Sequence, residues 1–141
     1  MTKGEIHPLL KSNGYKPRTG NAMRTADNLF SQYIRARDRV CQKCGTDQKL
    51  QCSHIKSRAI KSIRYNDDNA MALCLRCHIY WWHKEPLEAS EWMHKKFPGR
   101  YDRICKAQLE GIGKKIDYDA VKSELHEKLK SVTALESIDN F

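Results

Sequence analysis

The sequence has no long hydrophobic run, no low-complexity tract and no internal repeat beyond two short cysteine pairs. No stretch of its 141 residues approaches the roughly 20 apolar residues that a membrane span requires. The basic N-terminal segment also lacks the apolar run of a secretory signal. These absences argue against a membrane protein and against an exported one, and they predict a protein of the cytoplasm.

Acidic residues are scarce relative to basic ones. The chain has 17 aspartates and glutamates against 26 lysines and arginines, a formal net charge of +9. The excess lies in residues 1–116, because residues 117–141 hold six acidic and only three basic residues. A polyanion is therefore the expected partner, and nucleic acid is the first candidate. The alternative is that the charge only keeps a small protein soluble.

The length suits a single domain with appended segments. Residues 1–24 mix basic residues with closely spaced glycines and prolines, which predicts a flexible basic arm. We assign residues 25–105 to the main domain and residues 106–141 to a C-terminal helical extension.

Apolar residues at helical spacing predict helices over residues 25–39, 86–97 and 117–137. Thr25 is the expected N-cap of the first, and Pro98-Gly99 is the expected end of the second. The apolar stripe of the third is predicted to pack either on the core or on a second copy of the chain. A short strand is predicted within residues 48–55.

Six cysteines in a chain that is not exported are more often metal ligands than disulfides. Four of them form two Cys-x-x-Cys pairs, Cys41 with Cys44 and Cys74 with Cys77. Two such pairs supply the four tetrahedral thiolates of a closed zinc site, which fixes a fold and leaves no open position for catalysis. We therefore predict a structural Zn²⁺; the alternative is four unrelated buried thiols.

Between the two pairs, the chain contains His54 in LQCSHIKSR and Asn69 in YNDDNAMALC, and His78 follows Cys77 directly. This order resembles the HNH, or His-Me finger, endonucleases, whose pattern is His, then Asn, then Leu-Cys-x-x-Cys-His. The resemblance covers about residues 29–85. The aromatic segment WW-H-x-x-P-L-E-x-x-x-W further resembles the phage-encoded branch near the NinG and Rap recombination nucleases.

The resemblance implies an α+β fold with a small ββα-metal core, braced by the zinc and flanked by helices. It implies a metal-dependent DNA endonuclease of phage recombination, packaging or DNA processing, acting in the host-cell cytoplasm, with branched DNA among its substrates. His54 would be the base that activates water, a task that suits a neutral imidazole at physiological pH. Asn69 would hold the loop that orients His54, and His78 would bind a catalytic Mg²⁺ or Mn²⁺.

Many members of this family carry Asp or His immediately before the base as a second metal ligand, where this chain has Ser53. One explanation is a Mg²⁺-like ion that keeps several waters and is also coordinated by the substrate phosphate. The other is a ligand from elsewhere, and His83 and Asp68 are the candidates.

Several basic residues near His54 are expected to bind backbone phosphates, which fix a protein on DNA without reading its sequence. The set is Arg35, Arg37, Lys56, Arg58, Lys61 and Arg64. The alternative for them is a solvated loop face.

Two other functions stay open. A non-catalytic, zinc-stapled DNA-binding module would need the four cysteines but neither His54 nor Asn69. An adaptor for a phage packaging or recombination complex would use the C-terminal helix to bind a phage protein or a second copy.

Overall fold

The computed structural model describes residues 20–139, and their side chains as far as residue 134. Most of the predicted basic arm therefore lies outside the described residues. Its last five residues, 20–24, belong to helix α2 (Gly20–Asp38) instead. Thr25 consequently lies inside the helix, where its hydroxyl donates to the carbonyl of Asn21 at 2.9 Å, and it is not the N-cap.

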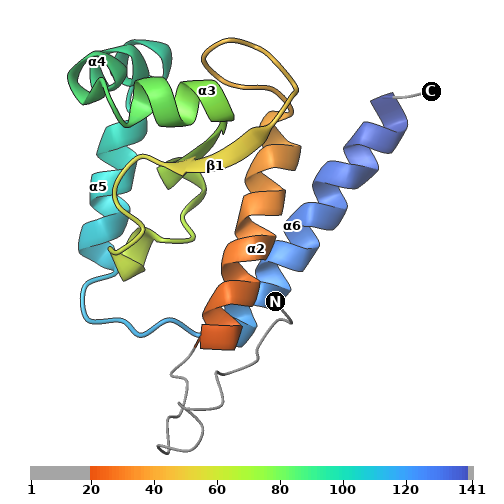
Figure 1. The fold of residues 1–141 in the computed structure, drawn as a ribbon. Coiled ribbons are helices and arrows are strands. Elements are labelled where there is room, and N and C mark those ends of the chain that lie inside the picture. The colour runs from red at the N-terminus through yellow and green to blue at the C-terminus, as the bar shows by residue number, and fades with distance from the viewer. Residues whose placement is uncertain (1–19, 140–141) are drawn as a thin grey trace, which may run out of the picture.

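Two short antiparallel strands form the centre of the molecule (Figure 1). Strand β1 (Leu50–His54) pairs with β2 (Ala70–Cys74), with His54 opposite Ala70. Every residue of β2 is buried. The chain between the strands contains two 3₁₀ turns, η1 (Lys61–Ile63) and η2 (Asp67–Asn69). The sheet thus places the end of β1 beside the start of β2.

Helical segments follow β2. A single turn, α3 (Leu75–Cys77), continues into a π-helical turn, η3 (His78–Trp82). Helices α4 (Pro86–Lys96) and α6 (Tyr118–Asp139) confirm two of the predicted helices.

Helix α5 (Arg100–Glu110) was not predicted. Gly99, with φ of 80°, lets the chain turn sharply after α4 and start a new helix at once, so Pro98-Gly99 joins two helices. The domain boundary predicted between residues 105 and 106 falls inside α5.

Two hydrophobic clusters hold these elements together. The first joins α2, α6 and the sheet around Phe30, Ile34 and Leu125. The second surrounds the cysteines and includes Met71 and Leu73 of β2. Helix α6 lies along α2 (Figure 1), and its apolar stripe packs against the first cluster.

The arrangement is α+β, as predicted. Among residues 20–139, no helix is both long and apolar enough to cross a membrane.

Candidate metal centre and active site

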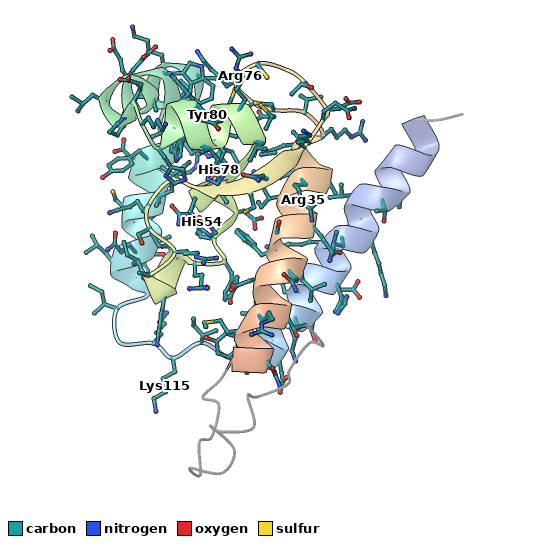
Figure 2. The ribbon with its side chains drawn as sticks, viewed as in Figure 1. Arg35, His54, Arg76, His78, Tyr80 and Lys115 are labelled. Atoms are coloured by element: carbon teal, nitrogen blue, oxygen red, sulfur yellow. The ribbon has the colours of Figure 1, made fainter. Side chains whose placement is uncertain are left out.

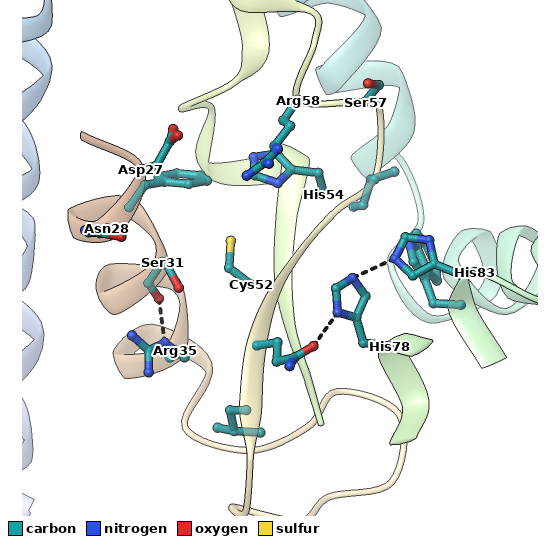
Figure 3. Close-up of a pocket in the computed structure, with 15 residues that line it drawn as sticks. Asp27, Asn28, Ser31, Arg35, Cys52, His54, Ser57, Arg58, His78 and His83 are labelled. Atoms are coloured by element: carbon teal, nitrogen blue, oxygen red, sulfur yellow. Dashed lines mark hydrogen bonds between the residues drawn. The ribbon is translucent and has the colours of Figure 1, made fainter. Parts of the chain in front are cut away.

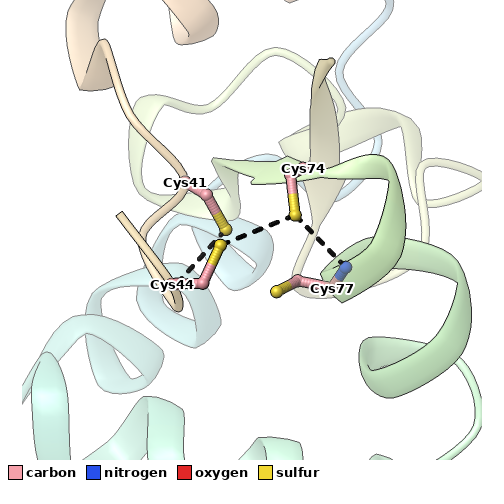
Figure 4. Close-up of side chains that lie close together, drawn as sticks. All are labelled: Cys41, Cys44, Cys74 and Cys77. Carbon is pink, nitrogen blue, oxygen red and sulfur yellow. Dashed lines mark hydrogen bonds between the residues drawn. The ribbon is translucent and has the colours of Figure 1, made fainter. Parts of the chain in front are cut away.

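The four paired cysteines meet in one cluster (Figure 4). Cys41 follows α2, Cys44 lies in the next turn, Cys74 ends β2 and Cys77 ends α3. All four sulfurs lie within 4.8 Å of one another, and those of Cys44 and Cys74 are 3.7 Å apart. A tetrahedron with metal–sulfur bonds of about 2.3 Å has edges of about 3.8 Å, so these residues could hold a metal ion such as zinc.

Backbone N–H groups favour the thiolate form of Cys41, whereas burial raises the pKa of the Cys77 thiol. The N–H of Cys44 donates to the sulfur of Cys41 at 3.5 Å, and the N–H of Cys77 donates to that of Cys74 at 3.4 Å. Burial alone would raise the pKa of the Cys41 thiol, but backbone N–H groups around it lower the pKa to about 7. A thiol that ionises near neutral pH suits a metal ligand, because the thiolate is the form that binds.

A groove of about 910 Å³ runs along β1 between α2 and the π-helical turn η3 (Figure 3). We call it the site groove. His54, His78 and His83 all line it. Asn69 and Asp68 do not. Asp68 instead pairs with Arg103 of α5 at 3.1 Å, which removes it as the alternative metal ligand.

His54 stands at the end of β1 with one ring nitrogen fixed. Its Nε2 lies 2.9 Å from the carbonyl oxygen of Arg64. A carbonyl only accepts, so Nε2 carries the proton and Nδ1 is left as the acceptor. Burial, and then the charges of Arg58 and Arg64, lower the pKa of His54 below its ordinary value, against the opposing effect of the Arg64 carbonyl. His54 is therefore a neutral imidazole with one basic nitrogen at neutral pH.

Asn69 is fully buried behind the groove. Its Oδ1 accepts from the backbone N–H of Lys56 at 2.8 Å. Its Nδ2 donates to the carbonyls of Lys56 and Ile63 at 3.0 and 3.1 Å. Three hydrogen bonds thus tie the start of β2 to the loop that follows His54.

His78 and His83 meet across the π-helical turn, with their Nε2 atoms 2.9 Å apart. They lie five positions apart in the sequence. An α-helix does not bring residues at this spacing onto one face, but a π-helix does. Nδ1 of His78 lies 2.6 Å from Oε1 of Gln51. Because an amide oxygen only accepts, Nδ1 of His78 is the donor, and its Nε2 accepts the hydrogen bond from the Nε2–H of His83.

The two imidazoles could hold a divalent ion in place of the hydrogen bond between their Nε2 atoms. Ligands about 2.1 Å from one metal and about 90° apart have a separation of about 3.0 Å, close to the spacing of the two Nε2 atoms. The bond from His78 to Gln51 is the usual outer support of a metal-bound histidine. Within the described part of the chain, no Asp or Glu completes a group of three with them. The remaining positions around an ion would fall to water and substrate.

Two arginines predicted to bind phosphate are held inside the protein. Arg37 donates to the carbonyls of Asp67 and Ala70 at 2.7 and 2.9 Å. Arg64 binds both carboxylate oxygens of Asp27, at 2.9 and 2.7 Å. These guanidinium groups hold α2 to the loop between the strands, so they are not available to phosphate.

The other four basic residues differ in their exposure. Lys56 donates to Gln108 of α5 at 2.5 Å, so it is also occupied. Arg35 and Arg58 are exposed and line the site groove. Lys61 is exposed and lies outside that groove. Local sequence could not separate the free groups from the bound ones, because their partners come from distant segments.

Three residues of the groove escaped the sequence analysis. Gln51 supports His78, and Asp27 contributes a carboxylate that Arg64 holds. The thiol of Cys52 also lines the groove, but burial raises its pKa to about 12, so it stays protonated at neutral pH. Alternation along β1 could have placed Cys52 and His54 on one face; nothing in the sequence marks Asp27.

Comparison of the chain with protein-family models, with curated proteins and with solved structures gave no match. The functional argument therefore rests on the site itself.

Proposed function

We propose that the protein is a metal-dependent DNA endonuclease of the HNH type, which hydrolyses phosphodiester bonds in the site groove. The order of elements supports this proposal: a strand that ends in His54, a loop held by Asn69, a second strand, and a helical turn that carries His78. The four-cysteine cluster links the end of the second strand to that helical turn.

One observation carries the proposal. An imidazole with a free, basic Nδ1 and a pair of imidazoles with converging Nε2 atoms line the same groove. Phosphodiester hydrolysis needs a base for water and a cation that stabilises charge on the phosphate. A module that only binds DNA has no need for either.

Each group has a role that its contacts support. His54 accepts the proton of the attacking water at Nδ1, while the Arg64 carbonyl holds its ring in place. Arg58 and Arg35, free of carboxylate partners among the described residues, bind phosphate oxygens at the two ends of the groove. A divalent ion on His78 and His83 would supply the positive charge that stabilises the phosphate.

The donor set bears on which ion is used. Mg²⁺ prefers oxygen ligands and retains its waters, whereas imidazole nitrogens suit transition metals. Two imidazoles without a nearby carboxylate ligand therefore favour Mn²⁺ over Mg²⁺.

The test is nicking of supercoiled plasmid and of a branched DNA junction by purified protein, with added Mn²⁺, added Mg²⁺ or neither. We expect metal-dependent cleavage that is stronger with Mn²⁺. A protein that binds both DNAs but cuts neither, with any divalent ion, would instead be the zinc-stapled binding module. The junction is included because of the resemblance to phage recombination nucleases.

A further inference from the structure

A second hollow lies on the other side of the segment that borders the site groove. Its volume is about 400 Å³, and it lies between η1, the linker of residues 111–117 and the first half of α6. Four lysines line it: Lys61, Lys114, Lys115 and Lys128. We call it the lysine hollow.

The linker is fixed in place against η1. A Cβ on Gly111 would lie 2.5 Å from the Cβ of Ser62, so only glycine allows this approach. The hydroxyl of Ser62 donates to the carbonyl of Gln108 at 3.5 Å, just before the linker. The N–H of Lys114 then bonds to the carbonyl of Gly111 at 3.2 Å. These contacts bring Lys114 and the turn that contains Ser62 to the same hollow.

Three of the four lysines have uncompensated charge. Lys128 is bound by Asp67 at 2.9 Å and by Glu124 at 3.0 Å. Lys61, Lys114 and Lys115 are exposed, and none of them has a carboxylate partner within the part of the chain that the structure describes.

Two carboxylates also line the hollow, and neither pairs with these three lysines. Asp117 caps α6 through the N–H of Ala120 at 3.1 Å, and Glu124 pairs with Lys128. The four lysines outnumber these two carboxylates, and the remaining positive charge favours binding of a polyanion.

The lysine hollow lies next to Arg58, a cationic residue at the edge of the site groove. Residues 57–62 separate the two hollows: Ser57 and Arg58 line the site groove, and Lys61 and Ser62 line the lysine hollow. In Figure 2, Lys115 lies below His54. A DNA backbone that leaves the site groove at Arg58 would therefore meet Lys61 next.

We propose that the lysine hollow binds the phosphates of duplex DNA that flank the bond to be cut, through Lys61, Lys114 and Lys115. This inference rests on the proposed function, and it assigns DNA contacts to the linker before α6, a part of the chain that the sequence analysis treated as an extension. Because these contacts lie away from His54, they position the substrate and take no part in the chemistry.

The experiment measures binding of a fluorescent duplex of about 30 base pairs as a function of salt. All proteins carry His54→Ala, and no divalent ion is added, so that binding is measured without cleavage. Each phosphate contact contributes about 0.9 to the slope of log affinity against log salt. Lys114→Gln with Lys115→Gln should therefore reduce the slope by about 1.8, and adding Lys61→Gln should reduce it by about 0.9 more.

The matched control is Lys49→Gln with Lys106→Gln. Both lysines are exposed, have no carboxylate partner within the described residues, and line neither hollow. The control removes the same charge and should leave the slope unchanged. Thermal unfolding of each variant checks that the fold is intact.

The outcomes separate the two proposals. An unchanged slope for the linker variant, or equal reductions in the linker variant and the control, would overturn the lysine hollow as a binding site. Neither result bears on the proposed endonuclease activity, which the nicking assay measures independently. Absence of any duplex binding would overturn both proposals.

Discussion

Asn69 holds Lys56 at both of its backbone polar atoms, accepting from its N–H and donating to its carbonyl. This is the pairing that a neighbouring strand would provide, made here by one side chain. It lets the loop after His54 leave the sheet without leaving buried backbone groups unpaired. The side chain thus fixes the path of the chain immediately after the candidate base.

Asn69→Ala should therefore weaken the fold and abolish cleavage together. Removing three hydrogen bonds of about 1 kcal/mol each predicts a loss of about 3 kcal/mol in the free energy of unfolding. Urea denaturation measures it. Asn66→Ala is the control, because that side chain accepts one hydrogen bond, from the N–H of Asp68, and should cost about 1 kcal/mol. Equal losses in the two variants would contradict the role given to Asn69.

Changing a cysteine of the cluster should release the metal and unfold the domain. Metal binding in small domains of this kind contributes on the order of 10 kcal/mol to folding. Elemental analysis should find one zinc per chain in the wild type and none in Cys44→Ser or Cys77→Ser. Cys105→Ser, outside the cluster, should keep its zinc and its melting temperature. A Cys77→Ser protein that folds without zinc would contradict the structural role given to the cluster.

His54→Ala and His78→Ala should both stop cleavage, but for different reasons. A general base contributes typically 10² to 10⁴ in rate and little to binding, so His54→Ala should stay inactive at every metal concentration. His78→Ala should lose affinity for Mn²⁺ and recover part of its activity when Mn²⁺ is raised. Cleavage rates across a Mn²⁺ titration distinguish them. Wild-type rates for His54→Ala would refute the proposed mechanism.

Arg35 and Arg37 lie two residues apart and should respond in opposite ways. Arg35 lines the groove, so Arg35→Gln should reduce the salt slope of DNA binding by about 0.9 and leave stability unchanged. Arg37 donates to two backbone carbonyls, so Arg37→Gln should cost about 2 to 3 kcal/mol in the free energy of unfolding. Its salt slope should stay at the wild-type value. The reverse pattern would show that the two side chains had been assigned wrongly.

The sequence predicted what depends on spacing along the chain. Two Cys-x-x-Cys pairs predicted the metal cluster, and apolar periodicity predicted α4 and α6. It missed α5, because Pro98-Gly99 is compatible with either an end or a reversal, and only the positive φ of Gly99 decides between them. Arg37 and Arg64 looked like phosphate ligands because their partners, in η2 and α2, come from distant parts of the chain.

The contact between His78 and His83 is another feature that spacing in the sequence did not predict. In an α-helix, residues five positions apart do not share a face, so α-helical spacing would keep His83 away from His78. A π-helical turn contains one more residue per hydrogen-bonded ring, and it brings these two rings together. The sequence of residues 78–82 does not predict a π-helical turn.

That extra residue also affects how related proteins would be recognised. Deleting one residue between His78 and His83 would restore α-helical geometry and keep both imidazoles on one face, now four positions apart. A search pattern written for the four-residue interval would pass over this chain, although the two nitrogens converge in the same way. An insertion-tolerant pattern, allowing either interval after Cys-x-x-Cys-His, would collect both kinds of sequence.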